Sequence, residues 1–152
     1  MSDFSPGVRL GVDVGKVRVG VSICDPHAIL ATPLVTLPRD LTAADDVLPA
    51  DIRELARLVT EHEAVGVVVG LPVTLAGGHG PAAAHVTAYA DRLAEVIVPV
   101  PVVLVDERMS TVVASRRLSE RGVRGRRQRA VVDQAAAVEI LQSWLDAQRR
   151  RT

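Results

Sequence analysis

The stretch VRLGVDVGKVRVGVSI, residues 8–23, decides the fold. Apolar side chains alternate along residues 8–14 and again along residues 17–23, which is the pattern of half-buried β-strands. The dipeptide Gly15-Lys16 separates the two runs, so the pattern predicts an antiparallel hairpin. A short turn leads from there to a third apolar run, residues 28–37. The three strands together predict an antiparallel meander.

Beyond the meander, the pattern changes to helices that alternate with strands. The spacing of apolar residues predicts a helix over 49–62, and a continuous β-branched run predicts a buried strand over 65–69. The remaining expected elements are a helix over 82–96, a buried strand over 102–105, a helix over 111–120 and a last helix over 131–148. This order predicts an α/β fold: a mixed sheet, built from the three-strand antiparallel meander plus two parallel strands, with flanking helices.

Length and composition favour one globular domain over residues 1–152. A chain of 152 residues with 48% hydrophobic and 24% charged residues can build one full core. Its longest apolar runs are far shorter than the roughly 18 residues of a membrane span. The first ten residues lack the apolar core of a signal peptide, and a single cysteine excludes an internal disulfide. We therefore expect a cytoplasmic protein with no membrane partner and no structural zinc.

The net charge of zero conceals an uneven distribution. Residues 1–107 carry seven basic and fourteen acidic side chains, whereas residues 108–152 carry eleven arginines and four acidic side chains. Such asymmetry indicates an anionic partner. Because the chain has only three aromatic residues, we expect a nucleic acid to be held mainly through its phosphates. The stretch RGVRGRRQR, residues 121–129, is a predicted phosphate contact through arginines such as Arg126 and Arg127.

Carboxylates occur in three places where burial would disfavour their charge. Asp13 lies inside an apolar strand, Asp106-Glu107 ends another, and Asp133 lies in the first turn of the last helix. Ordinary explanations exist, because a helix dipole stabilises an aspartate near its N-terminus and a strand-end carboxylate can pair with arginine. Convergence of these carboxylates would instead form a site for Mg²⁺ or Mn²⁺, ions that promote phosphodiester hydrolysis. The pattern alone leaves both interpretations open.

Two glycine-rich segments invite comparison with phosphate-binding loops. GVDVGK, residues 11–16, has one residue too few between its glycines for a Walker A motif, and no Ser or Thr follows Lys16. We therefore reject that interpretation. Residues 77–80 lie just before a predicted helix, where they could form a phosphate nest or an ordinary surface loop.

Four segments together resemble the YqgF/RuvX family. They are GVDVGKVRVGVS, VVVGLPVTLAGGHGP, VDERMST and VVDQAAAVEILQSWL, in the order and spacing of the family, and the resemblance extends from Arg9 to about Leu145. It implies an RNase H-like fold, related to the RuvC resolvases, in a single nuclease domain. Members of the family are described as nucleases of pre-16S ribosomal RNA and, formerly, as Holliday-junction resolvases.

The resemblance also implies the residues of the site. Asp13, Glu107 and Asp133 match the family's acidic positions and would hold Mg²⁺ or Mn²⁺. Adjacent strand residues point to opposite faces, so Glu107 is favoured as the ligand and Asp106 is a second catalytic candidate. The candidate substrate-binding residues are Lys16, Arg18, Arg108, Ser110, Thr111, Arg126 and Arg127. Lys16-Val17 stands where many members have Thr-Lys, and Thr74 stands where many have asparagine; neither departure removes a proposed metal ligand.

The expected function is therefore metal-dependent endonucleolytic cleavage in the 5′-end maturation of pre-16S rRNA. The expected partners are precursor rRNA and a ribosomal subunit, with the chain acting as a monomer or homodimer. A first alternative is a Holliday junction resolvase acting on branched DNA, which would be expected to work as a dimer. A second is a non-catalytic RNA-binding module in ribosome assembly. Nucleotide binding of the actin and sugar-kinase type is disfavoured, because it needs two domains.

Overall fold

The computed structural model describes residues 4–44, 46–72, 80–107 and 125–150, with the side chains of the last range described from Gln134 onward. A five-stranded sheet forms the centre of the fold, in the order β3-β2-β1-β4-β5. Its strands are β1 (Arg9–Val14), β2 (Arg18–Cys24), β3 (Ala31–Pro38), β4 (Gly66–Leu71) and β5 (Val102–Asp106). The helices are α1 (Ala50–Glu61), α2 (Pro81–Ile97) and α4 (Gly125–Arg150).

The pairing of the strands confirms the expected mixed sheet. β1 pairs antiparallel with β2, and β2 pairs antiparallel with β3. β4 runs parallel to β1 and to β5, which it separates. The carboxyl ends of β1, β4 and β5 therefore lie at the same edge of the sheet, where functional residues of open α/β sheets commonly gather.

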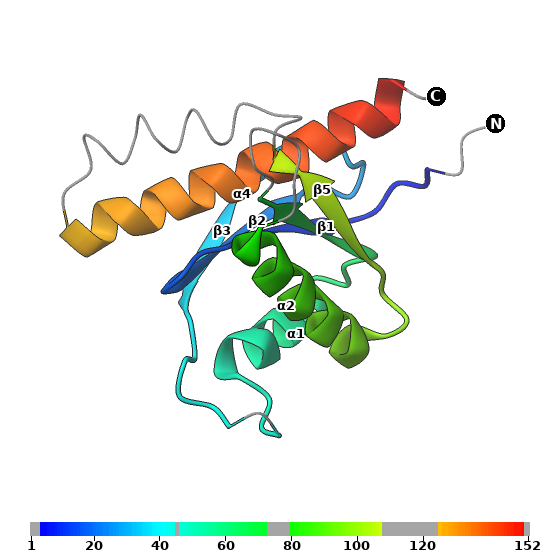
Figure 1. Ribbon diagram of the computed structural model, residues 1–152. Coiled ribbons are helices and arrows are strands. Elements are labelled where there is room, and N and C mark those ends of the chain that lie inside the picture. Colours follow the sequence, from blue (N-terminus) through cyan, green and yellow to red (C-terminus); the bar gives the residue numbers. More distant parts are fainter. Residues whose placement is uncertain (1–3, 45, 73–79, 108–124, 151–152) are drawn as a thin grey trace.

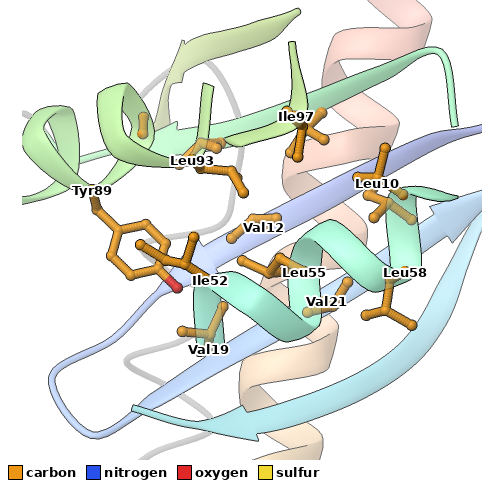
Figure 2. Close-up of a cluster of buried hydrophobic side chains, with 14 of the residues drawn as sticks. Leu10, Val12, Val19, Val21, Ile52, Leu55, Leu58, Tyr89, Leu93 and Ile97 are labelled. Carbon is orange, nitrogen blue, oxygen red and sulfur yellow. The ribbon is translucent and has the colours of Figure 1, made fainter. Parts of the chain in front are cut away.

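Helices α1 and α2 cover one face of the sheet, and α4 crosses the other (Figure 1). On the first face, alternate residues of the strands pack against both helices. Figure 2 shows this cluster, whose fully buried members include Leu10, Val12, Val19, Val21, Ile52, Leu55 and Leu93. Burial of each such side chain stabilises the fold by about 1.5–3 kcal/mol. The cluster fixes which residues of β1 face α1 and α2, and hence which face α4.

Small residues let α4 approach the sheet closely. A β-carbon on Gly11 would lie 2.7 Å from Cβ of Leu141 and 2.8 Å from the carbonyl oxygen of Ala137. That carbonyl also accepts a hydrogen bond of 2.8 Å from Oγ of the buried Ser22. About one turn nearer the N-terminus of the helix, Nε2 of Gln134 donates to Oγ1 of Thr36 over 2.9 Å. These contacts fix the position of α4 across β1, β2 and β3.

Two predicted boundaries were wrong. The third strand begins at Ala31 and not at residue 28, because the carboxylate of Asp25 accepts the backbone N–H groups of His27, Ile29 and Leu30 and holds that segment in a turn. The last helix begins at Gly125 and not at residue 131. Arginine and glutamine are good helix formers, so part of the expected connection is helical.

The predicted burial of the strand over 102–105 was also wrong. Val103 and Leu104 are 36% and 37% exposed, because β5 is the last strand in the order of the sheet. All six residues of β4, by contrast, are buried, which confirms the prediction for residues 66–69. Val65, which was also expected in this buried strand, precedes it and is 44% exposed. The helix expected over 111–120 lies outside the described residues.

Candidate functional site

Asp13 lies on the face of the sheet that α4 covers. Leu10 and Val12 point into the cluster formed with α1 and α2, and successive strand residues point to opposite faces. Gly11 and Asp13 therefore share the opposite face, where Gly11 contacts α4. The aspartate is 3% exposed. A carboxylate is thus buried at the carboxyl end of the central strand.

Glu107 lies on the same face, beside the neighbouring strand. It directly follows β5 and is 5% exposed. A β-carbon on Gly70 of β4 would lie 3.0 Å from Oε1 of Glu107 and 2.5 Å from Cδ1 of Ile140 in α4. Val12 pairs with Val69 and Gly70 pairs with Val105, so Gly70 stands between the strands that carry the two carboxylates. Because Gly70 has no side chain, Glu107 can reach over β4 towards Asp13.

Asp106 lies on the other face. Its pairing partner in β4 is Leu71, which belongs to the cluster with α1 and α2. The alternation of strand residues therefore separates Asp106 from Glu107, and Glu107 is the member of the pair that shares the α4 face with Asp13.

The third expected carboxylate is on α4. The backbone of Asp133 belongs to this helix and directly precedes Gln134, which contacts Thr36 of β3. Its side chain, like those of Arg126 and Arg127, lies outside the described part of the chain, as do Arg108, Ser110 and Thr111 entirely. Among the described residues, no three His, Cys, Asp or Glu side chains gather at one point.

A cleft of about 890 Å³ lies next to Asp13. It runs between the β1–β2 turn, residues 14–18, and the start of α2, and its lining includes Lys16, Arg18 and Arg39. The turn is closed by a 2.8 Å hydrogen bond from the N–H of Gly15 to the carbonyl of Arg18. Two of the predicted substrate-binding residues therefore lie beside Asp13 on one short turn.

A buried ionic network supports this turn. Nη1 of Arg39 donates to the carbonyl of Gly15 over 2.8 Å, and its Nε lies 3.4 Å from Oδ2 of the buried Asp51 in α1. The hydroxyl of Tyr89 in α2 donates to the same Oδ2 over 2.6 Å. Burial, together with the bond to Asp51, raises the pKa of Tyr89 well above its usual value. Arg39 thus connects the turn to both helices.

The family model described as "RuvX: Holliday junction resolvase" matches residues 7–147. The chain belongs to the RuvX family. Curated relatives match along nearly the whole chain and carry the name "Putative pre-16S rRNA nuclease". The protein of Rhodococcus erythropolis is 51% identical over 150 residues, covering 99% of this chain and 84% of that relative. The protein of Mycolicibacterium paratuberculosis is 55% identical over 150 residues, covering 99% and 86%.

A solved structure with the same fold is that of T. thermophilus RuvC in complex with a Holliday junction substrate. It superposes with a TM-score of 0.54 over 95% of this chain and 96% of that one, at 15% sequence identity. This likeness shows that the RuvX-family chain has the RNase H-like fold, as its sequence predicts. No helix among its described residues has the length and apolarity needed to cross a membrane.

The sequence of this RuvX-family chain did not single out Arg39, Asp51 or Tyr89. Asp51 is near the start of a predicted helix, where an acidic residue is ordinary, and Tyr89 is 38 residues away from it. One available signal was the position of Asp51 beside Ile52, which is buried in the core. Recognising the network required knowledge of how α1 and α2 pack.

Proposed function

We propose that this RuvX-family chain is a metal-dependent endonuclease that hydrolyses phosphodiester bonds in the 5′-end maturation of pre-16S rRNA. The observation that carries the proposal is the placement of Asp13 and Glu107: both are buried on the α4 face, at the ends of strands that flank Gly70. The names of the relatives support the choice of RNA substrate. We further propose a single nuclease domain over residues 1–152, acting in the cytoplasm.

The described carboxylates fit a divalent cation. Mg²⁺ and Mn²⁺ prefer carboxylate oxygens as ligands, and a cation offsets the cost of burying negative charge. Asp13, Glu107 and Asp133 would hold the ion, with Asp106 as the alternative to Glu107. When bound, the ion supplies positive charge that activates the attacking water and stabilises the leaving oxygen.

The side chains around the carboxylates bind and orient the strand. Lys16 is exposed and Arg18 is half-buried on the turn that follows β1, so their charges neutralise phosphates close to Asp13. Glu107 is buried beside Gly70, which restricts the positions that its carboxylate can take. The remaining proposed substrate contacts are Arg108, Ser110, Thr111, Arg126 and Arg127, which follow Glu107 in the chain or precede Asp133.

A second candidate function is resolution of branched DNA. The description of the matching family model favours it. A resolvase that cuts two strands is expected to act as a homodimer, whereas RNA cleavage, alone or on a ribosomal subunit, is compatible with a monomer. The two functions use the same site and differ in its substrate, which is precursor rRNA in one case and branched DNA in the other.

The test is cleavage of a precursor 16S rRNA 5′-end fragment and of a four-way DNA junction, each with Mg²⁺, with Mn²⁺ and with EDTA. We expect metal-dependent cleavage of the RNA by the wild type and by Asp91→Asn, which changes an exposed aspartate of α2. We expect none from Asp13→Asn. Cleavage of the junction alone would favour the resolvase. Binding of RNA without cleavage in either metal would favour the non-catalytic module.

A further inference from the structure

The cleft beside Asp13 is larger than a site for phosphate alone requires. Its volume of about 890 Å³ is within the range of pockets that enclose small organic ligands. Lys16 and Arg18 lie on one side, and Pro81 and His85 of α2 lie on the other. The cleft is therefore large enough to receive a base and a sugar as well as a phosphate.

Exposed aliphatic side chains line this cationic cleft. Val17 is 53% exposed and Leu41 is 64% exposed, and both belong to its lining. Single exposed apolar residues are common, but these two lie in one concave site together with two cations. Aliphatic side chains provide contact for the flat face of a nucleobase, and the cations provide contact for the phosphates of the same strand.

One residue of the cleft lining, Arg39, is held in position by its contacts within the protein. Arg39 is held by Asp51 and by the carbonyl of Gly15, and its planar group lies 5.0 Å from the centre of the Tyr89 ring. Its Nη2 lies 3.2 Å from Nε2 of His85. Arginine can only donate, so in a hydrogen bond between the two groups Nε2 is the acceptor. The imidazole of His85 is exposed in the lining of the cleft, where a base or a phosphate could contact it.

We infer that this cleft receives one unpaired nucleotide of the substrate strand, adjacent to the phosphodiester that is cut at Asp13. The inference rests on the proposed function and specifies its substrate class: RNA that is single-stranded at the cleavage site. A base inside a duplex is stacked and paired, and it must be extruded before it can enter such a pocket. Val17 and Leu41 would contact the base, while Lys16 and Arg18 bind the flanking phosphates.

The experiment measures binding without cleavage. Fluorescence anisotropy in EDTA compares a labelled 12-nucleotide single-stranded RNA with the same RNA annealed to its complement. We expect the wild type to bind the single strand about tenfold more tightly, and the uncharged variant Val17→Ser to lose about fivefold for the single strand with little change for the duplex. Val96→Ser is the matched control, because it makes the same change at an exposed valine of α2 outside the cleft. Thermal melting checks that each variant is folded.

The outcomes distinguish a failure of this inference from a failure of the proposed function. Equal binding of single strand and duplex, or wild-type binding by folded Val17→Ser, would overturn the inference even if the wild type cleaves RNA with Mg²⁺. If the protein shows the expected binding pattern but cleaves no RNA with Mg²⁺ or Mn²⁺, the nucleotide site is supported and the proposed function is overturned.

Discussion

The carboxylate of Glu107 lies against the α-carbon of Gly70: a β-carbon at Gly70 would be only 3.0 Å from Oε1 of Glu107. The glycine is in the strand next to Asp13, and the glutamate follows the strand on its other side. Any side chain at residue 70 would occupy the space through which Glu107 extends. The absence of a side chain in β4 is therefore part of how two carboxylates come to share one edge of the sheet.

Gly70→Ala should reduce activity more than stability. The added methyl group meets the ends of two side chains, Cδ1 of Ile140 at 2.5 Å and Oε1 of Glu107, which can move at a cost of about 1 kcal/mol. Displacement of Glu107 by about 1 Å should lower the rate of RNA cleavage about a hundredfold. Single-turnover cleavage and urea denaturation measure the two effects. Wild-type cleavage by Gly70→Ala would contradict the assigned position of Glu107.

Gly11→Ala, in contrast, should reduce stability more than activity. Its added methyl group collides with Oγ of Ser22 and meets the backbone carbonyl of Ala137 and Cβ of Leu141. Neither the carbonyl nor a β-carbon can move without shifting α4, so we expect a loss of about 3 kcal/mol in the free energy of unfolding. Urea denaturation measures it. A loss no larger than that of Gly70→Ala would contradict the described packing of α4 on the sheet.

Tyr89→Phe should destabilise the fold through the network under the β1–β2 turn. The variant removes the 2.6 Å hydrogen bond to Oδ2 of Asp51 and leaves that buried carboxylate with one donor fewer. We expect the free energy of unfolding to fall by about 1–3 kcal/mol. Removing the carboxylate as well, in Asp51→Asn with Tyr89→Phe, should cost less than the sum of the two single variants. Strict additivity would show that the two groups do not interact.

Acid should weaken the fold through two aspartates in turns. Backbone hydrogen bonds, the largest contribution coming from the N–H of Leu30, lower the pKa of Asp25 below its ordinary 3.8. The N–H of Ala50 contributes most to the lowered pKa of Asp40. Because both folded-state pKa values are depressed, this stabilisation is complete above pH 3.8 and is lost as the pH falls through the lower values.

Denaturation midpoints between pH 6 and pH 2 measure this dependence. The double variant Asp25→Asn, Asp40→Asn should show a smaller loss of stability on acidification than the wild type, while Asp91→Asn should retain the full loss. An unchanged acid dependence in the double variant would show that other groups cause it.

The sequence was informative where a property depends on neighbours along the chain. Alternation in residues 8–23 predicts the hairpin and places Asp13 on the face opposite Val12, and the same rule separates Glu107 from Asp106. Helix spacing likewise predicts α1 and α2 to within a few residues. These features follow from the periodicity of one element at a time.

Other features depend on how distant elements meet, and local pattern could not show them. An apolar run does not reveal whether its strand is central or at an edge, so the exposure of Val103 and Leu104 was missed. The turn before β3 depends on three hydrogen bonds to one carboxylate, that of Asp25. The contact between Asp51 and Tyr89 exists only because α1 and α2 pack side by side. Each of these features is determined by tertiary packing and not by the local sequence pattern.

The central claim is that Asp13 is required for the chemistry and not for the fold. The most direct test is metal-dependent cleavage of the precursor 16S rRNA fragment by Asp13→Asn, measured beside its affinity for the same RNA in EDTA and its melting temperature. We predict a cleavage rate below detection with Mg²⁺ and Mn²⁺, with RNA affinity and folding close to those of the wild type. Cleavage at the wild-type rate by the folded variant would contradict the account.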